Sequence, residues 1–155
     1  MSRTDVTQTL SALTEKLIDP RNDPRIYWAK EVTFDYATPT PVRVDYMRFK
    51  PLNNTVSGIE KGDFYCYEVK SSVADFHSKH GHNFIGDFNY YVMPKTVFEA
   101  VREQIPFFVG VYCPDDAGTV LSSIKKAQRK DRGRPVAEML LMMYRSAARE
   151  LRKTR

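Results

Sequence analysis

The chain has 155 residues, enough for one domain with a single core, and its 42% hydrophobic and 28% charged residues are typical of a folded, soluble protein. No apolar run approaches the roughly 20 residues that cross a bilayer, so we expect no membrane association. The first ten residues lack the apolar core of a signal peptide, which predicts a cytoplasmic protein. We expect the two cysteines, Cys66 and Cys113, to be free and mostly buried thiols.

Positive charge is concentrated at the end of the chain. Residues 125–155 contain eleven Lys/Arg and three Asp/Glu, a local net charge of +8, whereas the whole chain carries +5 and residues 1–124 therefore carry −3. Such a segment suits contact with a polyanion such as nucleic acid. The alternative is a solvated helix whose last turns carry cations that complement the helix dipole.

The first half of the chain predicts one helix followed by three strands. The helix has an apolar stripe at three- and four-residue spacing, formed by Val6, Leu10, Leu13 and Leu17. The extended segments are 26–36, 42–51 and 64–70, with a loop between the last two. The stretch "SVADFHSKH" is expected to form a short helix that Ser71 or Ser72 caps and Gly81 ends.

The second half predicts two further strands and three further helices. The strands are 88–94 and 107–114, and the helices are 95–104, 119–130 and 136–155. Residues 119–155 are thus expected to form a basic, helical C-terminal segment. The whole pattern predicts one α/β domain over residues 1–155, with a mixed central sheet of about five strands flanked by helices.

Three charged residues on two neighbouring strands are the strongest functional signal. Period-two alternation in 64–70 places Glu68 and Lys70 on one face, and alternation in 42–51 places Asp45 on a face with Arg43 and Met47. If the two strands pair, Asp45 lies beside Glu68 and Lys70. The alternative is a solvated ion pair between Glu68 and Lys70 with Asp45 far away.

Such a group suits phosphodiester chemistry. Two neighbouring carboxylates repel each other, and a hard divalent cation such as Mg²⁺ relieves that repulsion. The cation can polarise a phosphoryl oxygen and activate water, while a lysine neutralises the charge that develops in the transition state.

Asp45 followed by the "EVK" of residues 68–70 resembles the active-site signature of the PD-(D/E)XK nuclease superfamily, whose core order of helix, three strands, helix and strand also matches. More narrowly, "RVDYMRF" and "EVKSSVADF" are similar to the MmcB-like DNA repair group. Val44 stands where the superfamily usually has proline, and "HSKHGHNF" stands where MmcB-like proteins carry an Asp-x-Lys-Trp pattern.

The resemblance implies a restriction-endonuclease-like core and specific roles for five residues. Asp45 and Glu68 would bind Mg²⁺, for which Mn²⁺ could substitute, with the Val69 carbonyl as a third ligand. Lys70 would be the catalytic lysine. Glu15 on the first helix would correspond to an acidic residue that some members add.

Other polar residues near this motif are candidates for accessory roles. Asp75 could lie near the metal or be only an ion-pair partner, and Ser71 and His77 are candidate site residues beside it. His77, His80 and His82 could bind zinc, although a polar loop at the rim of the site is the favoured interpretation. Four strand tyrosines could stack on bases or belong to the core; they are Tyr65, Tyr67, Tyr90 and Tyr91.

We therefore expect a Mg²⁺-dependent endonuclease or exonuclease that acts on DNA, in repair, recombination or the processing of phage or mobile-element DNA. The alternative is a catalytically weak or inactive module of the same fold that binds DNA or a protein partner. The C-terminal helices are a candidate interface for a homodimer.

Overall fold

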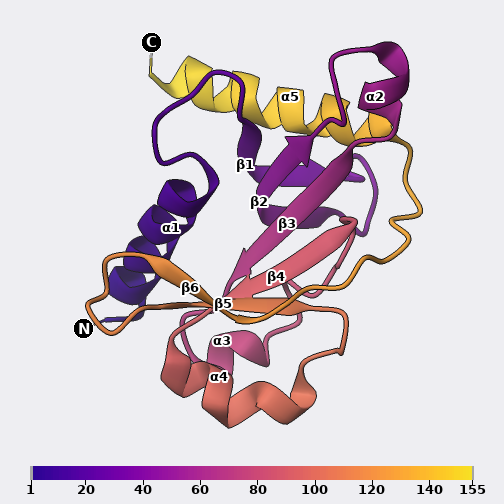
Figure 1. Ribbon diagram of the computed structural model, residues 1–155. Helices are drawn as coiled ribbons and strands as arrows, with labels where there is room; N and C mark the ends of the chain where they lie inside the picture. The colour runs from indigo at the N-terminus through magenta and orange to yellow at the C-terminus, as the bar shows by residue number, and fades with distance from the viewer. Residues whose placement is uncertain (1, 155) are drawn as a thin grey trace.

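Six strands form a single mixed sheet in the computed structural model, which describes residues 2–154 (Figure 1). The strands lie across the sheet in chain order, from β1 at one edge to β6 at the other. Neighbouring strands are antiparallel, except that β4 runs parallel to both β3 and β5. The strands are β1 (Tyr27–Phe34), β2 (Val42–Lys50), β3 (Asp63–Val69), β4 (Phe88–Val92), β5 (Gly110–Pro114) and β6 (Leu121–Lys125).

Helices flank this sheet, which confirms the predicted α/β class, with six strands in place of about five. They are α1 (Arg3–Ile18), α2 (Val56–Glu60), α3 (Val73–Phe76), α4 (Lys95–Val101), the 3-10 helix η1 (Arg102–Gln104) and α5 (Val136–Lys153). The loop expected between β2 and β3 contains α2, and α3 ends before the glycine that was expected to end it. Within residues 2–154, no helix is both long and apolar enough to cross a bilayer.

Helix α1 packs on one face of the sheet. Its first turn is fixed by a capping box, in which the Ser2 side chain accepts a hydrogen bond from the Asp5 N–H and the Asp5 side chain accepts one from the Ser2 N–H. The buried residues Leu10 and Leu13 then contact a cluster that includes Tyr67 of β3. The predicted apolar stripe is therefore the core-facing side of this helix.

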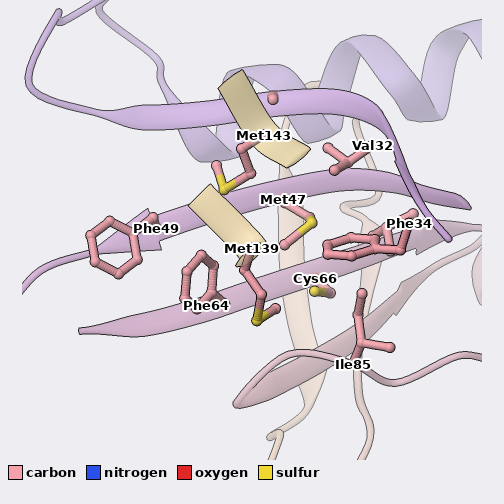
Figure 2. Close-up of a cluster of buried hydrophobic side chains, with 11 residues drawn as sticks. Val32, Phe34, Met47, Phe49, Phe64, Cys66, Ile85, Met139 and Met143 are labelled. Carbon is pink, nitrogen blue, oxygen red and sulfur yellow. The ribbon is translucent and has the colours of Figure 1, made fainter. Parts of the chain in front are cut away.

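The opposite face of the sheet is covered by two groups of helices. Met139 and Met143 of α5 pack over β1, β2 and β3, where they meet Met47 and Cys66 (Figure 2). Helix α4 packs over β4 and β5, and its buried Phe98 belongs to a second cluster there. Since Cys66 and Tyr67 are successive residues of β3, they point to opposite faces, as alternation requires.

The helix predicted over 119–130 is wrong. Residues Leu121–Lys125 form the edge strand β6, and 126–135 contain no helix. The cause is the turn before it: the Asp115 side chain accepts hydrogen bonds from the N–H groups of Thr119 and Val120, and Gly118 has a φ of +71°. This turn reverses the chain onto β5, where β6 gains sheet hydrogen bonds. The helical part of the predicted segment 119–155 is α5 alone.

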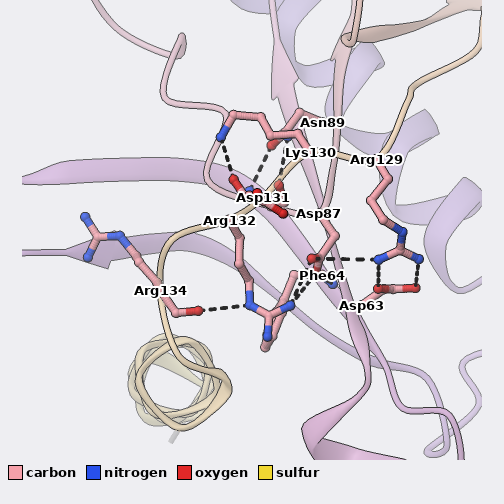
Figure 3. A network of polar contacts seen from close by, with 10 residues as sticks. Asp63, Phe64, Asp87, Asn89, Arg129, Lys130, Asp131, Arg132 and Arg134 are labelled. Atoms are coloured by element: carbon pink, nitrogen blue, oxygen red, sulfur yellow. Dashed lines mark hydrogen bonds and ion pairs between the residues drawn. The ribbon is translucent and has the colours of Figure 1, made fainter.

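Arginine–aspartate contacts hold residues 126–135 against the sheet (Figure 3). Arg129 forms two hydrogen bonds with Asp63, and Arg132 Nη1 lies 2.8 Å from Oδ2 of the buried Asp87. Arg134 is paired with acidic residues as well. Part of the basic charge at the end of the chain is therefore neutralised within the fold.

Candidate functional site

A cleft of about 1210 Å³ opens where β3 ends and β2 begins, between α1 and the loop after α3. Most of the residues singled out from the sequence line it. They are Glu15, Asp45, Glu68, Val69, Lys70 and Asp75. Ser71 and His77 do not belong to its lining.

The pairing of β2 with β3 brings the two carboxylates together. The strands are antiparallel with Tyr46 opposite Tyr67, so the next step along the pair sets Asp45 beside Glu68. Asp45 Oδ2 accepts a hydrogen bond from the Val69 N–H at 2.8 Å. The Asp45 carboxylate thus accepts the hydrogen bond of the Val69 N–H at the point where the regular pairing of β2 with β3 ends. Glu68 is buried, so a solvated surface ion pair does not describe this site.

The sheet is irregular around Asp45. Val44 and Met47 would face opposite ways in a regular strand, but both are buried in the cluster under α5. The expectation that Arg43, Asp45 and Met47 share one face is therefore wrong. Opposite Asp45 in β1, Glu31 has a φ of +51°, which is unusual for a residue other than glycine.

Contacts with α5 hold this strained residue in place. The Glu31 carbonyl accepts a hydrogen bond from Nη2 of Arg149 at 2.7 Å and a longer one from the Ser146 hydroxyl. The irregularity is thus a product of tertiary packing, and it opens the strand pairing at the position of the carboxylates.

Burial and mutual repulsion set the protonation of the carboxylate pair. Burial raises the pKa of Glu68 well above its ordinary value, and the negative charge of Asp45 raises it further. Burial also raises the pKa of Asp45, although its hydrogen bond from Val69 opposes that shift. Without a cation, the pair therefore tends to hold a shared proton.

The donors of this pair suit a hard divalent cation. Two close carboxylates that resist joint ionisation gain stability when a divalent cation replaces their proton. Within the described residues 2–154, no group of three or more His, Cys, Asp or Glu side chains could hold a metal ion. A cation would therefore depend on the two carboxylates together with main-chain oxygen, for which Val69 is the candidate.

Lys70 is fixed by the loop that follows α3. Its Nζ donates hydrogen bonds to the carbonyl oxygens of Asp75 and His80. A Cβ at Gly81 would lie 2.8 Å from Lys70 Nζ and 3.1 Å from Glu68 Oε2, and Gly81 has a φ of +77°. Glycine is thus required here both by the backbone conformation and by the close approach of the two charged side chains.

Helix α1 contributes Glu15 to the cleft. Glu15 Oε2 accepts a hydrogen bond from the Tyr46 hydroxyl at 2.7 Å, and Tyr46 neighbours Asp45 in β2. Burial, together with this hydrogen bond, raises the pKa of Tyr46. The hydroxyl therefore remains a donor and holds Glu15 at the cleft.

Asp75 has a structural role at the start of α3, where it binds Ser71 and Arg3. Asp75 Oδ2 accepts hydrogen bonds from the N–H and the hydroxyl of Ser71, and Oδ1 lies 3.0 Å from Nη2 of Arg3. Ser72 is the N-cap of α3, as one of the two predicted alternatives stated. Asp75 is thus an ion-pair partner that also lines the cleft, and it ties the start of α1 to α3.

The three histidines have separate surroundings. His77 Nε2 contacts the side chain of Gln104 in η1, away from the cleft. The Nδ1 of His82 forms a hydrogen bond with the Tyr91 hydroxyl at 2.6 Å, and its Nε2 forms hydrogen bonds with main-chain carbonyls. His80 lines the cleft, where its carbonyl oxygen accepts the bond from Lys70. The zinc interpretation has no support from these contacts, because both ring nitrogens of His82 are already engaged.

The strand tyrosines are mostly core residues. Tyr67 and Tyr91 are buried, and Tyr90 stacks on Tyr67 with 5.1 Å between ring centroids. Tyr65 stacks on Phe88 in the same way at 5.0 Å. A role in base stacking is therefore not available to Tyr67 or Tyr91.

A set of basic side chains at the rim of the cleft was largely missed from the sequence. Five basic side chains line it from α1, β1, β2, the loop after α3 and α5; they are Arg3, Lys30, Arg43, Lys79 and Lys153. They lie far apart in the chain, so only the folded arrangement gathers them. Three of them form ion pairs with Asp75 or Glu150, which also line the cleft. Within residues 2–154, Arg43 and Lys79 have no such pair, and their charges can attract an anionic substrate.

Comparisons with known proteins bear on the fold alone. No family model matches the sequence, and no curated protein matches it. A solved structure, "SPO1766 protein of unknown function from Silicibacter pomeroyi", is similar with a TM-score of 0.62 and 20% sequence identity. The match covers 94% of this chain and 88% of that chain. At this identity, the chain shares the fold of that protein.

Proposed function

We propose that the protein is a metal-dependent nuclease that hydrolyses phosphodiester bonds in DNA. The observation that carries this proposal is the pair formed by Asp45 and the buried Glu68, which lies beside Lys70 in a cleft with basic side chains at its rim. A pair of carboxyls with raised pKa values is a ready site for a divalent cation, and the rim suits a polyanionic substrate.

The order of elements supports assignment to the PD-(D/E)XK superfamily. Helix α1, the antiparallel strands β1, β2 and β3, helix α3 and the strand β4 follow one another as in the restriction-endonuclease-like core. Asp45 lies on the second of these strands, and the "EVK" motif stands at the end of the third. A role in DNA repair or in phage or mobile-element DNA processing is part of this proposal and follows from the MmcB-like resemblance.

Each residue of the motif has a definite task in this proposal. Asp45, Glu68 and the Val69 carbonyl would hold Mg²⁺ or Mn²⁺, which when bound supplies polarisation of a phosphoryl oxygen and activation of water. The Lys70 ammonium has three donors, two of which are used by main-chain carbonyls. The third is free to donate to a phosphoryl oxygen or to the attacking water, where its charge stabilises the transition state.

A second candidate is a nuclease-fold module that binds nucleic acid without cutting it. Two observations favour it. Within residues 2–154, no group of three side chains could bind a metal ion, and Lys70 Nζ already donates hydrogen bonds to two main-chain carbonyls. Both features would weaken metal binding or restrict the lysine.

Calorimetric titration with Mg²⁺ and Mn²⁺, alongside cleavage of plasmid and branched DNA, distinguishes the two candidates. We expect wild type to bind metal and cut, Glu68→Gln to do neither, and Lys70→Ala to bind metal without cutting. Glu60→Gln on the exposed surface of α2 is the matched control and should behave as wild type. Metal binding without cleavage by wild type would favour the binding module, and no metal binding at millimolar concentration would refute the nuclease.

A further inference from the structure

A second hollow of about 480 Å³ adjoins the cleft along α5. Thr33 of β1 lines both, so the two hollows are neighbours. Three arginines of α5 line the second one, at positions 145, 149 and 152. Their spacing of four and three residues places Arg145, Arg149 and Arg152 on one side of the helix. We call this hollow the arginine groove.

The charge of the arginine groove is not neutralised within the fold. Within residues 2–154, none of its three arginines forms an ion pair with a carboxylate. Arg129 and Arg132, by contrast, are both paired with aspartates. The basic segment thus divides into a part that anchors the chain and a part whose charge is available to a ligand.

Each guanidinium in the groove keeps donors free. That of Arg145 lies over the Tyr36 ring, 3.6 Å from its centroid, and stacking uses the flat face of the group, which leaves its N–H edge open. Its further contact is a long one to Met142 Sδ at 3.9 Å. Arg149 donates from Nη2 to the Glu31 carbonyl and the Ser146 hydroxyl, so its Nε and Nη1 remain available to donate to a ligand.

We propose that the arginine groove binds the sugar–phosphate backbone of a nucleic-acid strand whose adjoining phosphodiester lies in the cleft. Arg145 and Arg152 are separated by seven residues, about 10.5 Å along the helix, which corresponds to about three nucleotides of one strand at 3.4 Å each. Three nucleotide steps join four phosphates, so the three unpaired guanidiniums lie along a stretch of about four successive phosphates. Arginine forks suit this contact because they bind phosphate with two parallel hydrogen bonds.

Aromatic side chains favour nucleic acid over other anions. Tyr36 and Tyr144 line the groove and are 57% and 69% exposed. Unstacked bases can reach the ring of Tyr144 and the face of the Tyr36 ring that Arg145 does not cover. The direction of the strand, from groove to cleft, depends on the proposed nuclease function. The binding itself does not depend on cleavage, and the two are tested separately.

The test is the salt dependence of DNA binding, measured by fluorescence anisotropy in EDTA so that no cleavage takes place. In a variant with Arg145→Gln, Arg149→Gln and Arg152→Gln, the slope of log K against log salt for a labelled duplex should become shallower by about 2.7, or by about 2.1 for a single strand. Arg152→Gln alone should reduce the slope for the duplex by about 0.9. This single variant removes no hydrogen bond within the described residues and tests the groove if the triple variant fails to fold.

The matched control removes the same charge elsewhere. Lys95→Gln, Arg102→Gln and Lys126→Gln lie on exposed positions at α4, η1 and the residue after β6, and α4 and α5 lie at opposite ends of the molecule (Figure 1). This control should keep the wild-type slope. The proposal would be overturned if the control reduced the salt slope as much as the groove variants do, if the groove variants kept the wild-type slope, or if wild type did not bind DNA. Tighter binding to vesicles of anionic lipid than to DNA at the same salt would assign the groove to a membrane surface instead.

Discussion

Because its pKa is raised in the folded state, Glu68 should lower the free energy of unfolding of the metal-free protein as the pH rises. Burial, and then the charge of Asp45, raises the pKa of Glu68 in the folded state, whereas the unfolded chain ionises near the ordinary value of 4.5. Above that pH the folded state keeps a proton that the unfolded state has lost. The stabilising effect is therefore complete below the unfolded pKa, and it is lost as the pH rises towards the folded pKa.

The expected slope follows from one proton. While the folded state binds one proton more than the unfolded state, the free energy of unfolding falls by about 1.4 kcal/mol per pH unit. For a domain of this size, about 1 kcal/mol corresponds to about 2–4 °C in Tm, so the midpoint should fall by about 3–6 °C per pH unit. Glu68 is 5% exposed, so solvent screens this effect little.

The assay is urea unfolding in EDTA across a series of pH values, on wild type and on Glu68→Gln. The neutral amide of this variant resembles the protonated acid, so the two proteins should have similar stability near the unfolded pKa and diverge above it. Asp45 and Lys70, whose charges act on Glu68, are present in both proteins, so the difference between the curves reports the titration of Glu68 together with its effect on Asp45. Parallel curves for the two proteins would refute the reasoning.

Bound metal should have the opposite effect on stability, which adds a second part to the experiment. A cation that binds the ionised pair stabilises the folded state by about 1.4 kcal/mol when its concentration is ten times Kd. With Mg²⁺ present, the wild type should regain the stability that it loses at higher pH, and Glu68→Gln should not respond. A control variant, Glu60→Gln, should follow wild type with and without metal.

Three further predictions concern residues around the site and the core. Gly81→Ala should cost more stability in urea than Gly133→Ala, because both residues have positive φ, with strain of about 1–2 kcal/mol, but only a Cβ at Gly81 meets Lys70. Asp87→Ala should destabilise the protein in urea by about 3–5 kcal/mol, because it leaves its arginine partner and the N–H of a neighbouring strand unsatisfied. The Cys66 thiol should react with iodoacetamide only on unfolding, because burial raises its pKa well above the ordinary value.

Local patterns in the sequence were enough to predict most of the sheet. The strands at 42–51 and 64–70 are close to their observed bounds because alternation and aromatic content are local properties. Strand β6 could not be recognised in the same way, since "LSSIKK" is compatible with a polar helix. What decides its state is the turn at Asp115 and the free edge of β5, and the edge is available only in the folded protein.

The motif residues were predictable, but their surroundings were not. The sequence predicted that Asp45 would lie beside Glu68 if the two strands paired, because pairing between sequential strands is the simplest connection, and the strands do pair. The positive φ of Glu31 leaves no trace in the sequence, since the contact with Arg149 that supports it spans more than a hundred residues. The sequence also does not show which arginines of the basic segment are paired, because this depends on which aspartates lie next to them in the folded protein.

Within residues 2–154, two buried acidic sites differ in how their charges are satisfied, and the difference bears on function. Asp87 accepts hydrogen bonds from the Phe64 N–H and from Arg132, so its charge is compensated by the fold. Glu68 instead has a second carboxyl, Asp45, as its neighbour, and the positive charge of Lys70 offsets only part of the resulting rise in the pKa of Glu68. A well-packed apolar side chain would be more stable at such a position than a carboxyl whose charge is only partly compensated. Structure alone therefore accounts for Asp87, whereas Glu68 and Asp45 are explained if a cation completes the pair.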